Sequence, residues 1–396
     1  MSATSRTAVA TSVLATFTLA SSAIIAQQAG PTAHAPVELV EEANDTFICV
    51  FNPARPPADV SARAAALAAR HGGTVRHTYT TAIRGFAAAL PARAAARLAA
   101  QNADVAYCEA DGVVSAFGRP GGNAKPPGGG SQAETIPWGI SRVGGPADGT
   151  RLRAWVIDTG IDLAHPDLDV DLGCSANFVT RGKNSPADGH GHGTHVAGTI
   201  AALDNQIDVV GVAAGATLCA VRVLDSSGSG LVSWLVAGVD HVARSADRGD
   251  VANLSLGGSG HWQSLHDAIE NAADAGILFA IAAGNSGADA GNYEPAHIEH
   301  PNVYTVSAID SEGYLASWSN WGNPPVDFAA PGVSVLSTKK GGGTTTMSGT
   351  SMATPHVAGV LLLGTPGCDG NAAADPDQNR DPIVHLSGGG CSALTD

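Results

Sequence analysis

Apolar runs that alternate with amphipathic stretches dominate the chain from residue 135 onward. The runs typical of buried strands lie at residues 152–158, 217–224, 251–256 and 277–283. Helical patterns occur between them, at residues 195–203, 231–246 and 262–275. Apolar strands that alternate with helices predict an α/β domain with a mostly parallel central sheet covered on both faces, hence three layers. We expect its chemistry at the carboxyl ends of the strands.

A different pattern precedes this domain, at residues 45–114. Strand, helix, strand, strand, helix and strand patterns follow one another at residues 45–51, 58–70, 75–81, 85–90, 92–100 and 105–114. This order is that of a split βαβ unit, which predicts a small α+β domain of the ferredoxin-like type. A stretch rich in Gly and Pro, residues 117–130, follows it and predicts a flexible linker at a domain boundary.

The first residues have the features of an export signal. Arg6 supplies the positive charge, and residues 8–20 are apolar or small. This run is short and is interrupted by Thr and Ser, which disfavours a membrane anchor, and no other segment is apolar enough to span a bilayer. A cleavage site follows at Ala23, with Ala26 as the alternative, and we assign residues 1–26 to the signal peptide.

Composition narrows the classes of partner. The chain has 396 residues, of which 44% are hydrophobic, and a formal net charge of −15. Nucleic-acid binding needs a basic surface, so the charge argues against it. Export permits disulfides, and the six cysteines are an even number, which suits pairing.

Three residues in separate stretches carry the side chains needed for nucleophilic catalysis. Asp158 ends a strand pattern, His192 lies in the Gly- and His-rich residues 189–199, and Ser351 precedes the apolar run 357–363. A serine hydroxyl becomes a nucleophile when a neutral histidine takes its proton, and an aspartate holds that histidine in the required tautomer. Ser351 would lie in the first turn of a helix, where free N–H groups stabilise negative charge.

Ordinary structural roles compete with this interpretation. Ser351 fits the N-terminus of a core helix, and Asp158 fits a strand-end acid that caps a turn. His190, His192 and His195 could bind a metal, but no Glu lies between paired histidines as in the H-E-x-x-H zinc helix. The metal alternative is therefore disfavoured, and His195 is expected to be a packing residue.

Four sequence blocks resemble the motifs of the subtilisin-like serine proteases, and look closest to the proteinase K branch. They surround Asp158 and His192 and include residues 282–287 and 349–355. The chain order Asp, His, Ser is also that of subtilisin. The resemblance covers about residues 135–364, and residues 45–114 resemble the inhibitor-type propeptide of the same family. It implies a signal peptide (1–26), a propeptide (45–117), a linker (118–134) and a peptidase domain (135–396).

The resemblance also implies roles for further residues. The Asn285 side chain and the Ser351 N–H would form the oxyanion hole. Two segments would pair with an extended peptide: Ser229, Gly230, Ser255, Leu256 and Gly257. An uncharged S1 pocket, which favours apolar P1 residues, is expected at Ala282, Ala283 and Gly284. Pro301, Val303 and Asp327 match a family calcium site of two backbone carbonyls and a carboxylate, but carbonyl ligands leave almost no sequence trace, so the presence of calcium stays open. No cofactor is expected for catalysis.

The pairing of the cysteines follows from the same interpretation. If the propeptide leaves, a disulfide that ties it to the enzyme would defeat its release, so Cys49 would pair with Cys108. The four others then allow three arrangements, of which we favour Cys174–Cys219 with Cys368–Cys391. Free buried thiols are the alternative.

The expected protein is a secreted serine endopeptidase of broad specificity that works through an acyl-enzyme. Its partners would be protein or peptide substrates and its own propeptide, an intramolecular chaperone and inhibitor; no nucleic acid or membrane is expected, and the enzyme would be a monomer. Propeptide cleavage is expected near Gly118, with Gly130 as the alternative. An inactive peptide-binding homologue and a processing protease of narrow specificity are the other candidate functions. After Leu363 the chain looks loop-like, which leaves the packing behind the Ser351 helix open.

Overall fold

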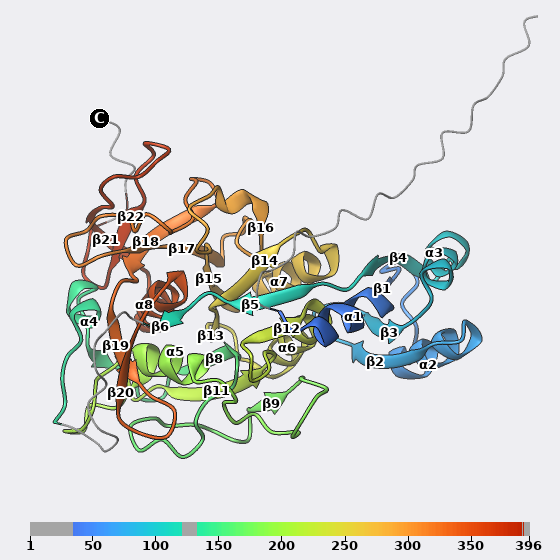
Figure 1. The fold of residues 1–396 in the computed structure, drawn as a ribbon, viewed down its shortest axis with the longest axis horizontal. Coiled ribbons are helices and arrows are strands. Elements are labelled where there is room, and N and C mark those ends of the chain that lie inside the picture. Colours follow the sequence, from blue (N-terminus) through green and yellow to red (C-terminus); the bar gives the residue numbers. More distant parts are fainter. Residues whose placement is uncertain (1–34, 121–132, 390, 392–396) are drawn as a thin grey trace, which may run out of the picture.

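The computed structural model describes residues 35–120, 133–389 and 391 of the chain. The predicted signal peptide and most of the predicted linker lie outside these residues. A smaller lobe projects from one side of a larger α/β domain (Figure 1). None of the helices in the described ranges is long and apolar enough to cross a membrane.

The larger domain is built on a nine-stranded sheet. Its order is β21–β22–β18–β17–β15–β13–β8–β11–β9, and the pairs from β22 to β9 are parallel, while β21 and β22 are antiparallel. The strands are β8 (Arg153–Asp158), β9 (Ala176–Asn177), β11 (Thr217–Arg222), β13 (Val251–Leu254), β15 (Leu278–Ala282), β17 (Val303–Ile309), β18 (Val326–Pro331), β21 (Gly367–Asn371) and β22 (Pro382–His385). The predicted mostly parallel sheet is confirmed.

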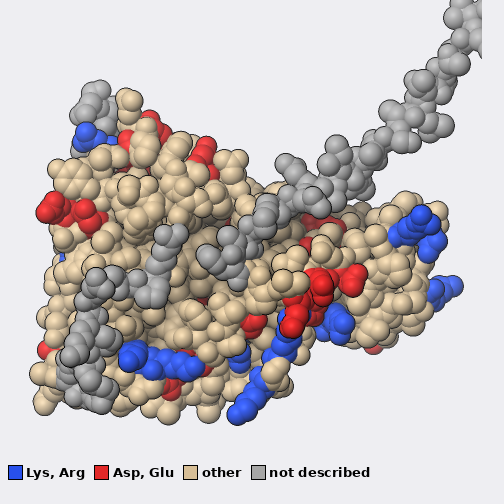
Figure 2. Space-filling view, viewed as in Figure 1, with Lys and Arg blue, Asp and Glu red and all other residues tan. Residues whose placement is uncertain are grey.

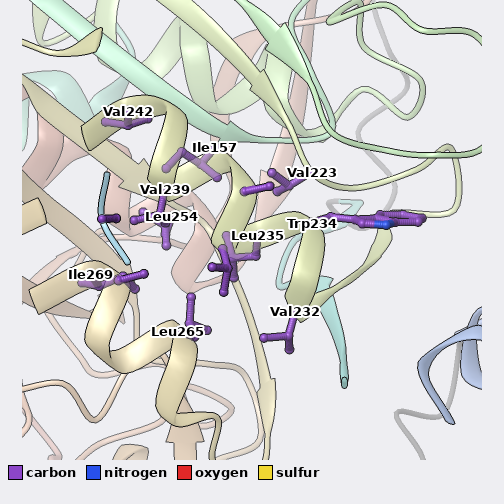
Figure 3. Packing of buried hydrophobic residues seen from close by; sticks show 14 of the residues in the cluster. Ile157, Val223, Val232, Trp234, Leu235, Val239, Val242, Leu254, Leu265 and Ile269 are labelled. Carbon is purple, nitrogen blue, oxygen red and sulfur yellow. The ribbon is translucent and has the colours of Figure 1, made fainter. Parts of the chain in front are cut away.

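Helices cover both faces of this sheet. Helices α6 (Val232–Ser245) and α7 (Gln263–Asp274) pack on one face. Ile157 of β8 and Val223, the residue after β11, contact Leu235 and Val239 of α6 there, together with Leu265 of α7 (Figure 3). Helices α5 (His192–Ala201) and α8 (Thr350–Leu363) pack on the other face, around residues such as Val156 and Ala280. The domain therefore has the three expected layers.

The smaller lobe is a four-stranded antiparallel sheet with two helices on one face. Its strands are β1 (Thr46–Phe51), β2 (Thr74–Tyr79), β3 (Gly85–Ala89) and β4 (Val105–Ala110), in the order β2–β3–β1–β4. Helices α2 (Val60–Arg70) and α3 (Ala92–Gln101) bury alanine and leucine against this sheet. A further helix, α1 (Val37–Asp45), precedes the sheet and carries acidic residues on the face of the molecule shown in Figure 2. Its Glu42 carboxylate accepts a hydrogen bond from Arg181 Nε of the larger domain (2.9 Å).

The open face of the small sheet rests on α6 and α7. Asp240 of α6 accepts hydrogen bonds from the N–H groups of Thr80, Thr81 and Ala82 (2.7–3.1 Å). Glu109 of the small lobe accepts from Gln263 N–H and Ser264 N–H (2.9 and 2.8 Å) in the first turn of α7. A carboxylate at a helix N-terminus satisfies free donors and complements the helix dipole. The two lobes are therefore joined by charge-assisted contacts as well as by apolar packing.

Two predicted strands are each divided in the structure. Residues 105–114 form β4 and then β5 (Val113–Ala116), because the chain turns at Asp111 and Gly112. Asp111 is buried and accepts from Ser233 N–H (2.9 Å), and a Cβ on Gly112 would lie 2.1 Å from the Trp262 ring. Residues 251–256 likewise divide into β13 and β14 (Leu256–Ser259). The local pattern of apolar residues does not predict such turns, because apolar residues occur on both sides of each turn.

Other boundaries also differ from the prediction. Helix α5 begins at His192 rather than at residue 195, because Gly191 adopts a left-handed φ of 115° that ends the preceding loop. Residues 119–120, which were assigned to a flexible linker, form β6 and pair with Ser348 and Met347 of β20 (Thr344–Ser348). The chain beyond α8 is not only loop, since β22 joins the main sheet and Leu386 N–H donates to Val143 O (2.9 Å).

The structure contains the three disulfides that were favoured, Cys49–Cys108, Cys174–Cys219 and Cys368–Cys391. Cys49 and Cys108 lie opposite each other on neighbouring strands β1 and β4. No disulfide joins the small lobe to the large domain in the described part of the chain. The small lobe can therefore separate once the chain between them is cut.

Candidate active site

Asp158 and His192 form a buried pair at one end of the sheet. Asp158 is the last residue of β8, and His192 is the first residue of α5. The His192 Nδ1 atom lies 2.8 and 2.9 Å from the two carboxylate oxygens of Asp158, and both side chains are buried. A carboxylate only accepts, so Nδ1 carries the proton and Nε2 is left with the lone pair that a general base needs.

The loop before α5 is held by Asp188, a residue that the sequence analysis did not single out. Its carboxylate accepts from the N–H groups of His190 and Gly191 (2.8 and 2.7 Å) and from the hydroxyls of Thr159 and Thr194 (2.9 and 2.5 Å). This network fixes the strand end that carries Asp158 relative to the helix that carries His192. An acid directly before the Gly- and His-rich motif was the available signal.

Ser351 occupies the first turn of α8, as predicted. Gly349 precedes the helix with a φ of 155°. The Ser351 Oγ donates to Ser255 O (2.7 Å), and Ser255 Oγ donates to Ser351 O (2.9 Å). That carbonyl is free to accept because Pro355, four residues later in the helix, has no N–H. These bonds hold the Ser351 hydroxyl at the boundary between α8 and the segment that joins β13 to β14.

The hydroxyl of Ser351 and the imidazole of His192 meet at one peptide bond of the same chain. Phe117 N–H donates to Ser351 Oγ (3.0 Å), and a Cβ on Gly118 would lie 2.8 Å from His192 Nε2. Nε2 itself has no hydrogen-bond partner among the described residues. Proton transfer thus requires the hydroxyl to turn from Ser255 O towards Nε2, a tightening that commonly accompanies reaction.

Asn285, the residue predicted for the oxyanion hole, contacts the carbonyl of the same peptide bond. Its Nδ2 donates to the carbonyl oxygen of Phe117, and its Oδ1 accepts from the N–H and the hydroxyl of Thr350 (both 2.9 Å). Thr350 therefore orients the amide so that its donor points at the carbonyl. A Cβ on Gly349 would lie 2.4 Å from the same oxygen, so the absence of a side chain there admits it.

The segment that ends at Phe117 lies between two strands of the large domain. Strand β5 pairs antiparallel with β12 (Ser229–Leu231), which places Ser229 opposite Ser115 and Gly230 opposite Val114. On its other side β5 pairs with β14, so Leu256 lies opposite Ala116 and Gly257 opposite Ser115. Ser255 O also receives Phe117 N–H (3.4 Å). An extended peptide is thus bound here as a middle strand.

The Phe117 ring lies beside Gly257, whereas the predicted S1 residues are held by Asn320. The ring occupies the space that a Cβ on Gly257 would need, since its Cζ would lie 2.8 Å away. Ala282, Ala283 and Gly284 lie directly before Asn285. Asn320 Nδ2 donates to Ala283 O (2.8 Å), and its Oδ1 accepts from the N–H groups of Ser286 and Ala288 (2.9 and 3.2 Å). Asn320, which sequence reasoning missed, therefore holds the loop that carries Asn285.

The remaining predicted residues lie apart from this centre. His195 is buried, and its Nε2 contacts Val335 O (3.1 Å); desolvation lowers its pKa to about 3, so it is a neutral packing residue. Pro301, Val303 and Asp327 line one surface hollow of about 350 Å³ together with Glu299 and His300. The three predicted calcium residues are therefore brought together.

Residues 155–385 match the model of the peptidase S8 group, described as the Subtilase family. The chain belongs to the subtilase family. Subtilisin E of Bacillus subtilis (strain 168) is 40% identical over 299 residues, which are 74% of this chain and 73% of that protein. An alkaline protease of Shouchella clausii is 46% identical over 239 residues, or 59% of this chain and 60% of that protein.

A solved structure agrees with the family. The crystal structure of a cold adapted subtilisin-like serine proteinase is similar with a TM-score of 0.55 and 36% identity, and covers 63% of this chain and 97% of that one. The predicted membership of the subtilisin-like proteases is confirmed, and the chain is a serine endopeptidase of this family that acts on protein substrates.

Proposed function

We propose that this subtilase is exported as a zymogen and cuts its own Phe117–Gly118 bond. One observation carries the proposal: the Phe117 carbonyl oxygen receives the Asn285 amide while the Phe117 N–H contacts the Ser351 hydroxyl. The carbonyl carbon between them is thereby presented to the nucleophile. Gly118, on the leaving side, lies against the His192 ring, where a side chain would not fit.

The chemistry follows from these positions. Ser351 Oγ adds to the Phe117 carbonyl carbon while His192 Nε2 takes its proton, and Asp158 stabilises the imidazolium that forms. The Asn285 amide, with the Ser351 N–H in the first turn of α8, stabilises the oxyanion. Collapse breaks the C–N bond, and His192 gives the proton to the amine of Gly118. Water then hydrolyses the ester on Ser351 by the same steps in reverse order.

The small lobe is proposed to act as an inhibitor and folding template after this cut. It places β5 along the substrate strands and holds α6 and α7 through Asp240 and Glu109. A product segment bound by two strand pairings and a second, helix-binding surface leaves slowly, because both must separate together. The disulfides, the signal-like first residues and the resemblance to subtilisins support an extracellular location.

We propose a broad specificity with a preference for apolar P1 residues. Phe117 is the natural P1 residue, and the residues assigned to the S1 wall, Ala282 to Gly284, carry no charge. A processing protease that requires Arg or Lys would need an acid in that wall. An inactive homologue is disfavoured by the intact Asp158, His192, Ser351 and Asn285.

A Ser351→Ala chain tests self-processing. We expect the wild-type secreted protein to begin at Gly118 and the Ser351→Ala protein to keep its propeptide uncut, since the nucleophile is missing. N-terminal sequencing reads both. A wild-type start close to Gly130 would move the cut into the linker, and a Ser351→Ala protein cut at Gly118 would mean that another protease makes this cut.

Turnover of casein and of a chromogenic apolar-P1 peptide, with and without a serine-directed phosphonate, separates the three candidate functions.

We also propose that a structural Ca²⁺ binds at Pro301, Val303 and Asp327. Calcium prefers oxygen ligands, and the hollow is lined by Asp327, whose carboxylate would be one ligand, and by Pro301 and Val303, whose backbone carbonyls would be the others. Desolvation and, to a smaller extent, the Glu299 charge raise the pKa of Asp327 to about 7. A cation bound beside this carboxylate would lower its pKa again. We expect Ca²⁺ added to the metal-free protein to raise the Tm of the wild-type protein and to leave the Tm of Asp327→Asn unchanged. Equal responses of both proteins would contradict this site.

A further inference from the structure

Three side chains far from the catalytic triad in sequence converge beside strand β14. They are His261, Glu294 and His297, and the one ligand atom that each offers lies within 4.8 Å of the others. His261 Nδ1 is 3.1 Å and His297 Nε2 is 3.6 Å from Glu294 Oε1. They come from the loop before α7, from β16 (Tyr293–Glu294) and from the turn after β16. The hydrogen bonds described for Asp158, His192, Ser351 and Asn285 do not involve these three residues.

Glu294 is a buried acid with little compensation. Its side chain is 0% exposed, and its Oε2 has no hydrogen-bond partner within the described part of the chain. Oε1 receives Trp262 N–H at 3.4 Å. Its ion-pair partners among the described residues are the two histidines and no Lys or Arg. A buried carboxylate is costly unless a cation accompanies it.

The tautomer of His297 is decided by its other nitrogen. Nδ1 lies 3.3 Å from Tyr293 O, and a carbonyl only accepts, so Nδ1 carries the hydrogen. In the neutral ring, Nε2 then presents a lone pair to a carboxylate oxygen that also has only lone pairs. Two acceptors that face each other need a positive charge between them. A histidine that donates its second N–H to a carbonyl is also the usual arrangement of a metal ligand.

We propose that His261 Nδ1, Glu294 Oε1 and His297 Nε2 bind one Zn²⁺ ion, with solvent in the fourth position. Zinc takes N and O ligands at about 2.0–2.1 Å in a tetrahedron, which sets neighbouring ligand atoms about 3.3–3.4 Å apart. The observed 3.1 and 3.6 Å bracket this spacing. Calcium is disfavoured because it prefers six to eight oxygen ligands. The His261 side chain is 59% exposed, so the ion can enter from solvent.

The ion would stabilise the outer edge of the substrate-binding region. Gly258 and Ser259 of β14 pair with Glu294 and Tyr293 of β16, while the other edge of β14 pairs with β5. The ion would therefore join the loop that follows β14, through His261, to β16 and the turn after it, through Glu294 and His297. The proposed role is structural: binding adds stability, because the ion has affinity for the folded arrangement and little for the separated residues.

The test uses the full-length chain with Ser351→Ala, which avoids self-digestion, after chelation of metals. Zn²⁺ is titrated by calorimetry, and Co²⁺ is followed by its visible absorption, which is intense for tetrahedral sites. We expect one ion per chain and a rise in Tm on adding Zn²⁺. His261→Ala and His297→Ala are expected to weaken binding at least tenfold, since even partners outside the coordination shell contribute about 10–100-fold. His71→Ala, in the small lobe, is the matched control and is expected to bind as the parent does.

Three outcomes would overturn the proposal: no zinc binding in the parent, equal affinity for Ca²⁺, or equal affinity of the His261→Ala and His71→Ala proteins. The last would place the zinc elsewhere, for example at His192. Absence of any metal binding would mean that a proton bridges Glu294 and the histidines. Because His261 is exposed, its variant should fold, and its metal-free Tm verifies this even if His297→Ala is unstable.

Discussion

At the residue scale, the active site depends on side chains that each satisfy two partners. Asn285 directs its Oδ1 to Thr350 and its Nδ2 to the carbonyl oxygen of Phe117, so both ends of its amide are held in place. Preorganised donors of this kind need no rearrangement when charge develops. The role of Asn285 was inferred from a family resemblance, but Thr350, which orients it, leaves no recognisable signal in sequence.

Replacement of Asn285 by Ala is expected to lower kcat by about 10²–10³, the loss known for the same kind of donor in subtilisin, a relative of this chain. KM should change little, because strand pairing with β12 and β14 is unaffected. Steady-state kinetics on an apolar-P1 peptide measures both. Asn184→Ala, which removes an exposed amide that contacts Asn177, serves as control. An unchanged kcat in Asn285→Ala would remove this residue from the oxyanion hole.

At the element scale, the sheet was predictable and the turns around the site were not. The strands at 152–158, 217–224 and 277–283 are found within a residue or two of the predicted ends, because long apolar runs have one stable environment. The breaks at Asp111 and Ser255 depend on groups distant in sequence, Ser233 and Ser351, which receive or supply the hydrogen bonds there. The start of β5, the strand that lies between β12 and β14, was therefore included in one longer predicted strand.

The Cys174–Cys219 disulfide provides a test at this scale. It ties β11 to the loop before β9 across 45 residues of sequence. The Cys174→Ser, Cys219→Ser double variant is expected to lose about 2–4 kcal/mol of unfolding free energy, chiefly because its unfolded chain gains freedom. Urea unfolding of the Ser351→Ala protein, with and without the two changes, gives this value. An unchanged midpoint and slope of the urea transition would show that the disulfide does not restrict the unfolded chain.

At the scale of the whole molecule, one buried acid links the small lobe to the enzyme. Asp111 Oδ1 accepts from Gly112 N–H and from Ser233 N–H (both 2.9 Å) at the start of α6. Its Oδ2 is buried without a hydrogen-bond partner in the described ranges. Desolvation raises the pKa of Asp111 to about 7. Once the lobes separate, the exposed carboxyl returns to an ordinary pKa of about 4.

If the small lobe is cut from the enzyme as proposed, its affinity for the large domain is expected to depend on pH. The complex holds the Asp111 proton more tightly than the free propeptide does, so affinity is greatest below pH 4, falls as pH rises to about 7 and is then level. The fall is at most about tenfold per pH unit. Co-elution of the cut propeptide with the enzyme between pH 5 and pH 8 measures it. Asp111→Asn should flatten the profile, and Asp59→Asn, a helix cap elsewhere in the lobe, should not. A profile that Asp111→Asn leaves unchanged would assign the dependence to other groups.

The sequence by itself determined the fold class, the order of the catalytic residues and the family. These follow from apolar periodicity and from short motifs in which backbone geometry and chemistry are local, such as the Gly- and His-rich turn before α5. Only the tertiary structure decided which peptide bond lies at Ser351, which acids of the small lobe cap α6 and α7, and that His261, Glu294 and His297 meet. Those contacts join residues far apart along the chain. Their positions are set by packing of the whole sheet and its helices, which no local pattern encodes.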